Sequence, residues 1–528
     1  MSNEILGQSI IGSGRGSAKV ETFRAFDPRT GNEVEPVFYS ASMDDLENAV
    51  RLAAESRIVY GKTSGKAKAE FLRRIATNIE ALGNTLVERI ELETALLPAR
   101  IESERGRTCF QLRMFADLVE EGSWVDARID HALPERTSIP KPDIRSMLRP
   151  LGPVAVFCAS NFPLAYSVAG GDTASALAAG CPVIVIAHTA HPGTAELVGT
   201  AVQDAAKTCG MPEGVFSLLF AKNYDIGQAL AAHTDIKAVG FTGSRTGGKA
   251  LMKIAAARPE PIPVYAEMSS VNPVFILPKA IAERGETIAE GLYNSFTLGA
   301  GQFCTKPGIV LLDSSTDSRA FGEKLESLAE NFTPIPLLTG GIQKSYFEGT
   351  TSRAVALDTN AAANKPEGFG VGANVFRTSV DRLLSDDELS SEIFGPTTLL
   401  VNAKNRDELL HAANDLEGQL TASVFGTDEE LAEYADLIAI LETKAGRLIF
   451  NGFPTGVEVC SSIVHGGPFP ATSDSRSTSV GSRAIERFCR LVCYQGFPEN
   501  GLPDELKESN PLSIQRMIDG DKKFCGVG

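Results

Sequence analysis

PVAVFCASNFPLAYSVAGGDTASALAAGCPVIVIAH, residues 153–188, is the stretch that decides the fold. Its apolar, mostly β-branched runs Val154–Cys158 and Pro182–Ala187 are typical of buried strands. The segment between them, Ser167–Ala179, is rich in alanine and is typical of a helix. Apolar strands that alternate with helices indicate a parallel sheet with both faces covered, so we expect an α/β fold.

The same alternation continues on both sides of a boundary near Met268. Before it, further strands are expected at Val215–Phe220, Ile236–Phe241 and Pro263–Ala266, with helices at Gly193–Lys207, Asp225–His233 and Gly247–Ala256. After it, strands are expected at Val274–Leu277, Ile309–Leu312, Thr398–Val401 and Arg447–Phe450. The pattern predicts two doubly wound α/β domains.

Two other regions of the chain have a different pattern. Residues 45–130 place apolar side chains at helical spacing, most clearly in Ala69–Ile90 and Leu96–Val119. Residues 137–149 and 488–528 fit neither domain, and we expect them to form a small β-extension for oligomerisation. The predicted division is a first domain from residues 1–136 and 150–267, a second domain from residues 268–487, and the extension.

The composition of the 528-residue chain argues against several classes of protein. A net charge of −16 disfavours a nucleic-acid-binding surface and attachment to anionic membranes. No apolar stretch approaches the ~20 residues that span a bilayer, and the N-terminus lacks the pattern of a signal peptide. Nine cysteines, an odd number without a CxxC pair, are typical of a reduced protein, and we expect a cytoplasmic location.

The segment GQFCTKPG, residues 301–308, contains the sharpest local signal for chemistry. Cys304 stands between the expected helix Ile288–Leu298 and the expected strand that begins at Ile309. A residue at the end of an element can be exposed and yet firmly held, as a nucleophile must be. The alternative is a small buried hydrophobic residue, which is the more common role of a cysteine.

Two polar segments follow expected strands of the first domain. Asn161, in ASNFP, lies at the carboxyl end of a strand, where ligands of parallel sheets gather, and its amide can donate to an oxyanion. Gly243 and Ser244, in VGFTGS, precede a helix whose first backbone N–H groups can bind a pyrophosphate. Ordinary turns are the alternative for both segments.

Two glutamates stand at positions that could carry chemistry. Glu267 ends an apolar strand, where a carboxylate is rarely found without a partner or a chemical task. A structural salt bridge and a catalytic role are equally compatible with that position. Glu392, in EIFGP at residues 392–396, precedes a Gly-Pro turn and by itself indicates only a solvated loop.

The order of the motifs Asn-Phe-Pro, Phe-Thr-Gly-Ser, strand-end Glu, Gly-Gln-x-Cys and Glu-x-Phe-Gly-Pro resembles that of the aldehyde dehydrogenase superfamily. Longer stretches are similar to bacterial 2-oxoglutarate semialdehyde (2,5-dioxopentanoate) dehydrogenases: GSWVDAR at residues 122–128, AEMSS at 266–270, NGFPTGVEVC at 451–460 and VHGGPFPATSD at 464–474. NADP-preferring long-chain aldehyde dehydrogenases share several of them. The resemblance implies a cofactor-binding first domain, a catalytic second domain, and a homodimer or homotetramer.

The resemblance also implies a reaction, the NAD(P)-dependent oxidation of an aldehyde to a carboxylate. The expected substrate is 2-oxoglutarate semialdehyde, which gives 2-oxoglutarate. Cys304 would add to the aldehyde carbon to form a thiohemiacetal, and Asn161 would stabilise its oxyanion. Hydride transfer to the nicotinamide leaves a thioester, and Glu267 would activate the water that hydrolyses it.

The resemblance further implies the contacts with the cofactor. It assigns the pyrophosphate to Gly243 and Ser244, and the nicotinamide ribose to Glu392 and Phe394. A departure stands at Ile186, where family members usually have a lysine for the adenosine ribose. Thr189 stands where many NAD-preferring members have glutamate; the loss of that carboxylate removes repulsion towards a 2′-phosphate, and Lys222 could offset the phosphate charge. We therefore expect NADP as well as NAD to be accepted.

Alternatives remain for the substrate and for the activity. A longer or more apolar aldehyde would use the same chemistry. Ile186 raises a second alternative, a redox-impaired paralogue that hydrolyses esters or only binds ligands. We expect no metal site, because His188 and His191 merely flank a helix start. His465 either lines the substrate channel or makes only structural hydrogen bonds.

Overall fold

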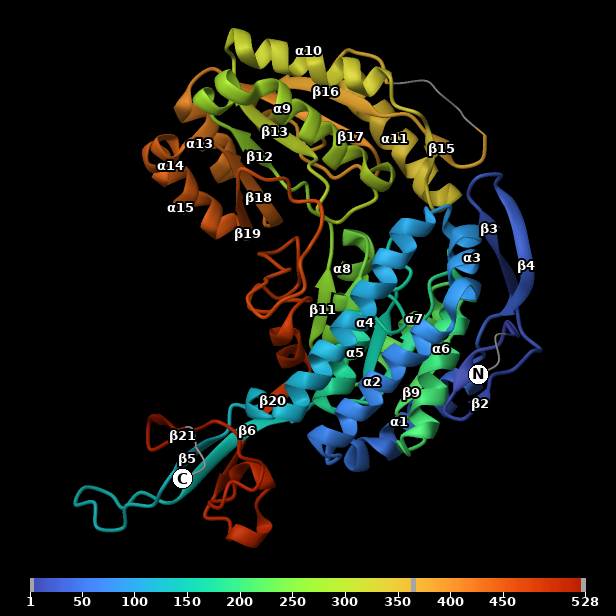
Figure 1. The fold of residues 1–528 in the computed structure, drawn as a ribbon, viewed down its shortest axis with the longest axis vertical. Helices are drawn as coiled ribbons and strands as arrows, with labels where there is room; N and C mark the ends of the chain where they lie inside the picture. Colours follow the sequence, from blue (N-terminus) through green and yellow to red (C-terminus); the bar gives the residue numbers. More distant parts are fainter. Residues whose placement is uncertain (1–3, 362–366, 524–528) are drawn as a thin grey trace.

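The protein, described here by a computed structural model over residues 4–361 and 367–523, is built around two parallel sheets (Figure 1). The first sheet has the order β11-β10-β7-β8-β9-β1-β2. Its parallel strands are β7 (Val154–Phe157), β8 (Val183–Ile186), β9 (Phe216–Leu219), β10 (Ala238–Thr242) and β11 (Val264–Glu267). Two short antiparallel strands, β1 (Ile10–Ile11) and β2 (Gly14–Arg15), extend the edge beside β9.

Helices cover both faces of this sheet. Successive strand residues point to opposite sides, and because they are apolar on both sides, each face needs a covering layer. Val154 and Val183 belong to one core, whereas the adjacent Ala155 and Ile184 belong to the other. The first core is closed by α2 (Gly65–Ala81), α3 (Gly83–Thr94), α4 (Pro98–Glu121), α5 (Gly171–Ala179) and α6 (Pro192–Thr208). The second is closed by α1 (Met43–Gly61), α7 (Asp225–Ala232) and α8 (Arg245–Ala256). The doubly wound architecture expected from the sequence is confirmed.

The second sheet is parallel throughout and has the order β16-β17-β13-β12-β18-β19. Its strands are β12 (Val274–Ile276), β13 (Ile309–Asp313), β16 (Asn374–Ser379), β17 (Thr397–Ala403), β18 (Gln419–Phe425) and β19 (Ala445–Phe450). One face packs on α9 (Pro278–Thr297) and α10 (Thr316–Glu330). The other packs on α12 (Val380–Ser385), α13 (Arg406–Asp415) and α15 (Ala435–Lys444). The smaller elements here are α11 (Gly340–Ala356), α14 (Asp428–Glu433) and the antiparallel pair β14 (Ile335–Pro336) and β15 (Gly370–Val371).

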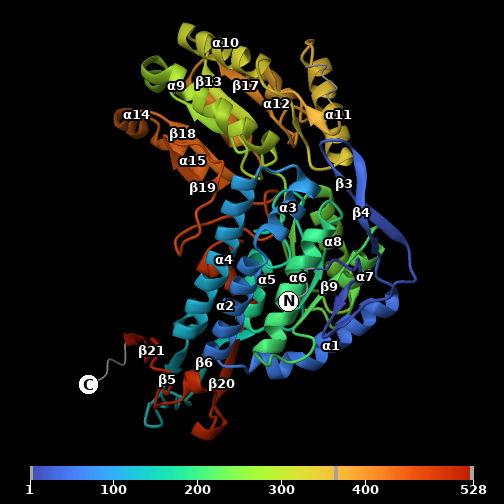
Figure 2. The same cartoon turned by 45° about the vertical axis from the view of Figure 1, so that its right-hand side comes forward.

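A third sheet projects from the body next to the C-terminus, as both views show (Figures 1 and 2). It has the order β20-β6-β5-β21-β22. Its strands are β5 (Arg128–Asp130), β6 (Ile144–Pro150), β20 (Cys489–Gln495), β21 (Arg516–Ile518) and β22 (Asp521–Lys523). Single 3-10 turns lie at Ser123–Val125, Glu499–Gly501 and Asp504–Leu506, and a longer one at Ser482–Phe488 precedes β20. A separate hairpin of β3 (Thr22–Asp27) and β4 (Asn32–Tyr39) lies along the first domain.

The helical region expected over residues 45–130 differs from the structure in two places. The stretch Ala69–Ile90 is broken between α2 and α3, because Gly83 adopts a left-handed φ of 54°. The helical region also ends early, at Glu121, and residues 128–130 form β5 instead. Among the described residues, no helix combines the length and the apolar character needed to cross a membrane.

The sequence did not reveal two strands of the second sheet, β16 and β18. Strand β18 is buried along its whole length although it contains Gln419, Thr421 and Ser423. Gln419 is tolerated there because its side-chain oxygen accepts hydrogen bonds from the Ser270 hydroxyl and the Val271 backbone N–H, at 2.9 and 2.8 Å. Such polar residues hide the apolar run by which a buried strand is recognised.

Candidate active site

The loop that carries Cys304 is fixed by unusual backbone geometry. It follows a 3-10 turn, Leu298–Gly301, and leads into β13. Gly301 has a left-handed φ of 67°, and a Cβ atom there would lie 2.3 Å from the carbonyl group of Gly395. Only glycine satisfies both conditions. The close approach brings the Gly-Gln-x-Cys loop against the Glu-x-Phe-Gly-Pro loop.

A buried asparagine, Asn272, holds the far side of the same loop. Its amide nitrogen donates to the carbonyl oxygens of Cys304 at 2.8 Å and Lys306 at 3.0 Å. Its side-chain oxygen accepts from the Ser270 and Thr421 hydroxyls, both at 3.0 Å. These bonds fix the backbone of Cys304. Sequence reasoning missed Asn272, and the only available signal was its place shortly after the strand-end glutamate.

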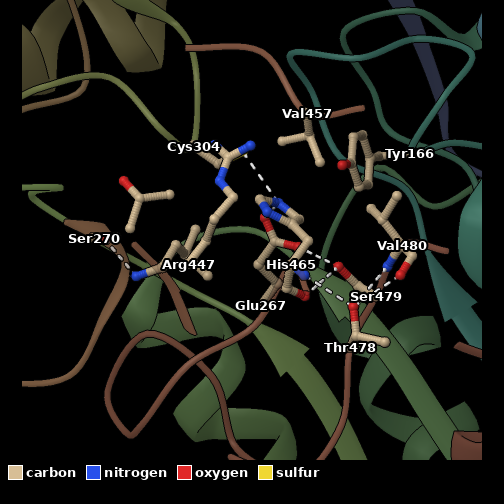
Figure 3. Close-up of polar contacts among 12 residues, drawn as sticks. Tyr166, Glu267, Ser270, Cys304, Arg447, Val457, His465, Thr478, Ser479 and Val480 are labelled. Atoms are coloured by element: carbon tan, nitrogen blue, oxygen red, sulfur yellow. Dashed lines mark hydrogen bonds and ion pairs between the residues drawn. The ribbon is translucent and has the colours of Figure 1, made fainter. Parts of the chain in front are cut away.

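Cys304, His465 and Glu267 meet at the centre of the site (Figure 3). His465 Nε2 lies 2.9 Å from Glu267 Oε1 and 3.5 Å from Cys304 Sγ. The Ser479 hydroxyl donates to the other carboxylate oxygen of Glu267 at 2.8 Å. The side chains of His465 and Glu267 are 1% and 3% exposed, so water screens this contact weakly. His465, considered either as a lining residue of the substrate channel or as a purely structural one, therefore contacts both Glu267 and Cys304.

The segment that carries His465 closes over the end of strand β11. Glu267 forms an antiparallel bridge with Thr472, and the Met268 N–H donates to the Ala471 carbonyl at 2.8 Å. The backbone N–H of His465 donates to the Thr478 hydroxyl at 2.9 Å, which fixes the backbone at this residue. The strand end and the covering segment therefore place the carboxylate and the imidazole together.

Burial and charge set opposite protonation states for the Cys304 thiol and the Glu267 carboxylate. Burial raises the pKa of the Cys304 thiol well above its ordinary value, and the Glu267 charge raises it further. Burial also acts to raise the pKa of Glu267, but His465, Ser479 and Cys304 together hold it below its ordinary value. At neutral pH the site therefore contains a thiol beside an ionised carboxylate, which can accept the thiol proton.

Asn161 lies where the first domain meets the Cys304 loop. Its side-chain nitrogen donates to the Gln302 carbonyl at 3.0 Å, and Phe162 packs edge-on against Phe303 with ring centroids 5.3 Å apart. An amide nitrogen carries two hydrogens, so one remains for a substrate oxygen. The structure thus brings Asn161 to the loop of Cys304.

The residues expected to contact the pyrophosphate lie at the exposed N-terminus of α8. The Ser244 hydroxyl caps this helix by accepting from the Gly247 N–H at 3.2 Å. The first N–H groups of a helix, here those of Arg245 and Thr246, have no acceptor within the helix. Gly243 and Ser244 are both exposed beside them. This end of α8 therefore fits a diphosphate group.

The residues expected near the adenosine ribose are arranged less simply. Ile186 is 8% exposed and is part of the core between the sheet and α1, α7 and α8. Thr189 is exposed in the loop after β8. The ammonium group of Lys222 is already paired with the Glu21 carboxylate at 2.8 Å. A lysine that neutralises a 2′-phosphate would have to share its charge with Glu21.

Glu392 and Phe394 lie, half-buried, in the loop that touches Gly301. Burial raises the pKa of Glu392 to about 7, against the opposing effects of Lys306 and Ser269. Lys306 is 1% exposed, and its ammonium group donates to the carbonyls of Ile393 and Thr397 at 3.1 and 2.8 Å. Glu392 therefore lies beside the Cys304 loop, in the segment that Lys306 holds through these two carbonyl groups.

His188 and His191, at which we expected no metal site, stack on each other with ring centroids 5.7 Å apart. The His191 ring is buried and its Nε2 lies 3.0 Å from the Ala159 carbonyl oxygen. Burial lowers the pKa of His188 to about 3, and His191 acts in the same direction. The pair has a structural role at the start of α6.

Comparison with known proteins decides the family. The model of the aldehyde dehydrogenase family matches residues 15–469. The chain belongs to the aldehyde dehydrogenase family. It is therefore an oxidoreductase that oxidises an aldehyde with NAD or NADP.

Two curated relatives match almost their whole length. Alpha-ketoglutaric semialdehyde dehydrogenase 2 of Azospirillum brasilense is 49% identical, over 98% of this chain and 99% of the relative. Alpha-ketoglutaric semialdehyde dehydrogenase of Acinetobacter baylyi is 43% identical, over 97% and 98%. Among solved structures, aldehyde dehydrogenase C of Pseudomonas syringae with NAD+ and octanal has a TM-score of 0.79 at 21% identity, and covers 93% of this chain and 97% of that one. At that identity the likeness supports the fold alone.

Proposed function

We propose that this aldehyde dehydrogenase oxidises 2-oxoglutarate semialdehyde to 2-oxoglutarate through a thioester on Cys304. The buried cluster of Cys304, His465 and Glu267 is the observation that carries the chemistry. The names of the relatives that are 49% and 43% identical over nearly the whole chain support this substrate. A longer, apolar aldehyde is the alternative for the same chemistry.

The first step needs the proton of Cys304 to leave before the sulfur attacks. Glu267 is the acceptor, because it is ionised and lies in the same cluster. One of its carboxylate oxygens, the Cys304 sulfur and a His465 ring nitrogen all lie within 4.8 Å of one another. With its hydrogen on Nε2, His465 donates to Oε1 while Ser479 donates to Oε2. These two donors stabilise the carboxylate before the reaction and tune how strongly it takes the proton.

The thiohemiacetal formed by Cys304 carries an oxyanion that needs donors. The second hydrogen of the Asn161 amide, whose first hydrogen is bonded to the Gln302 carbonyl, and the backbone N–H of Cys304 are the donors that we assign to it. A donor of this type is worth about 3 kcal/mol to the transition state. When bound, NAD or NADP accepts the hydride that leaves the thiohemiacetal. Once the proton taken from Cys304 has passed to solvent, Glu267 is ionised again and takes a proton from the water that hydrolyses the thioester, which releases the acid and returns Cys304 to its thiol.

A substrate panel tests this proposal. The purified protein is expected to oxidise 2-oxoglutarate semialdehyde with a kcat/KM about 100-fold above that for octanal. Octanal has no carboxylate and therefore cannot form charged hydrogen bonds with the protein. The absorbance of the reduced cofactor gives the rates. Cys304→Ala serves as the control and should reduce no cofactor with either aldehyde. A higher kcat/KM for octanal would assign the protein to apolar aldehydes instead.

We further propose that the enzyme accepts both NADP and NAD. Thr189 carries no charge to repel a 2′-phosphate, and Lys222 is a nearby cation whose charge Glu21 partly offsets. Neutralising Glu21 frees that cation for a phosphate.

Glu21→Gln is therefore expected to raise kcat/KM for NADP about fivefold and to leave that for NAD nearly unchanged, since an exposed ion pair is worth up to about 1 kcal/mol. Steady-state kinetics with each cofactor measure the ratio. A Glu33→Gln variant, which removes an exposed carboxylate from the neighbouring β4, is the control. Equal changes in kcat/KM for the two cofactors would show that Glu21 and Lys222 do not act on the 2′-phosphate.

We also propose that the protein forms a homodimer or homotetramer through the projecting sheet. Strand β20 is an edge strand, and its Leu491 is 66% exposed. Strand β19 is the edge of the second sheet, with Leu448 and Phe450 each 39% exposed. Unpaired edges with apolar side chains are typical of surfaces that another chain covers.

Light scattering coupled to size-exclusion chromatography measures the assembly. The wild type is expected at twice or four times the 56.2 kDa chain mass. Leu491→Arg, which places a charge on the exposed edge, is expected to shift the population towards smaller species. A wild type that runs as a monomer at micromolar concentration contradicts the proposal.

A further inference from the structure

Two arginines, Arg107 of α4 and Arg447 of β19, bind the same loop, residues 454–457. The Arg107 guanidinium donates to the Val457 carbonyl at 2.7 Å. The Arg447 guanidinium donates to the carbonyls of Pro454 and Gly456 at 2.7 and 3.1 Å. Both groups are therefore held in place by backbone atoms of residues 454–457.

The same two guanidinium groups lie near the nucleophile. Arg107 also donates to the Tyr166 hydroxyl at 3.3 Å, and the Tyr166 ring lies 6.1 Å from the His465 ring. His465 in turn contacts Cys304 at 3.5 Å. Arg447 lies close enough to Cys304 and Tyr166 for both to act on its pKa, and these residues are drawn together with His465 and Val457 in Figure 3. Two elements far apart in the sequence thus direct positive charge to the reacting sulfur.

The charges of this pair lack an anionic partner within the residues that the structure describes, and Arg107 lies over the Tyr166 ring, 5.6 Å from its centroid. All their recorded hydrogen bonds go to neutral acceptors, and neither guanidinium forms an ion pair with a described carboxylate. The Nε atoms of both side chains are buried and have no acceptor. Burial lowers the pKa of Arg447, and the charge of Arg107 acts in the same direction, while Cys304 opposes them. Two like charges held together in a partly buried place favour the binding of an anion.

The donors that remain match a 2-oxo acid. A guanidinium has five N–H hydrogens, and each arginine uses two of its nitrogens for the bonds described above. A 2-oxo acid presents two carboxylate oxygens and a neighbouring carbonyl oxygen, all acceptors. In 2-oxoglutarate semialdehyde the carboxylate carbon is four bonds from the aldehyde carbon, or roughly 5 Å in an extended chain. A substrate bound to Cys304 therefore carries its acceptors only a short distance from the sulfur.

We propose that Arg107 and Arg447 form the subsite that binds the 2-oxo acid end of the aldehyde substrate. This inference rests on the proposed function and deepens it, because it names the residues that select a carboxylated aldehyde. Arginine suits the task since its planar fork binds carboxylates through paired hydrogen bonds. The arginines act on the distant end of the substrate and leave the bond changes to Cys304, Glu267 and Asn161.

The test compares a charged and a neutral aldehyde of equal length, 2-oxoglutarate semialdehyde and pentanal, with the full-length enzyme at saturating cofactor. Arg447→Gln is expected to raise KM for the semialdehyde about 100-fold, with kcat nearly unchanged and little effect on pentanal. Arg107→Gln should act in the same direction, and Arg447→Lys should lose less because it keeps the charge. The matched control, Arg319→Gln, removes one exposed charge from α10 and should leave KM and kcat for both aldehydes unchanged.

The outcomes separate this inference from the proposed function. If the wild type prefers the semialdehyde but Arg447→Gln slows both aldehydes equally, the arginines only hold the loop, and the subsite is wrong while the function stands. If the wild type does not prefer the semialdehyde over pentanal, the proposed substrate fails and the subsite fails with it.

A second measurement uses only the wild type, so it does not depend on how the variants fold. 2-Oxoglutarate and pentanoate are compared as inhibitors of pentanal oxidation, because both end in the product carboxylate but only the first carries the 2-oxo acid. We expect 2-oxoglutarate to inhibit at a concentration about 30-fold lower. Equal inhibition would overturn the subsite.

Discussion

The contact between the Cys304 thiol and the Glu267 carboxylate, buried with His465, is the constraint on which the rest of the site depends. A buried carboxylate costs several kcal/mol unless donors surround it. Here the donors come from His465, Ser479 and Cys304, and two of the three belong to the segment that closes over strand β11. The arrangement keeps the carboxylate ionised and the thiol protonated, as the proposed transfer of the Cys304 proton to Glu267 requires.

The cluster draws its side chains from both sheets and from the segment that covers strand β11. Glu267 ends the last strand of the first sheet, whereas Cys304 precedes β13 of the second. The covering segment must come close to both. A Cβ atom at Gly446 would lie 2.1 Å from the Gly466 carbonyl oxygen, so strand β19 and the segment of His465 touch backbone to backbone.

The sequence predicted what local patterns can carry. Apolar β-branched runs identified the first sheet, and short motifs identified Cys304, Glu267 and Asn161 as candidates. It could not show β18, because Gln419, Thr421 and Ser423 interrupt the apolar run, and the hydrogen bonds that allow their burial come from a distant segment. His465 was undecided for the same reason. It lies 161 and 198 residues from its partners Cys304 and Glu267, and no local pattern records such a contact. Arg107 and Arg447 likewise gain meaning only when a helix and an edge strand meet at one loop.

The rate at which iodoacetamide alkylates Cys304, measured against pH, tests the central contact most directly. Mass spectrometry of the peptide that contains Cys304 distinguishes this cysteine from the others. In the wild type the thiolate should form only well above the ordinary pH range of a cysteine, because burial and the Glu267 charge raise its pKa. In Glu267→Gln the charge is gone, so the midpoint should move to lower pH, even though the variant turns over slowly. Coincident midpoints in the two proteins would contradict the account, since Glu267 would then not set the state of the sulfur.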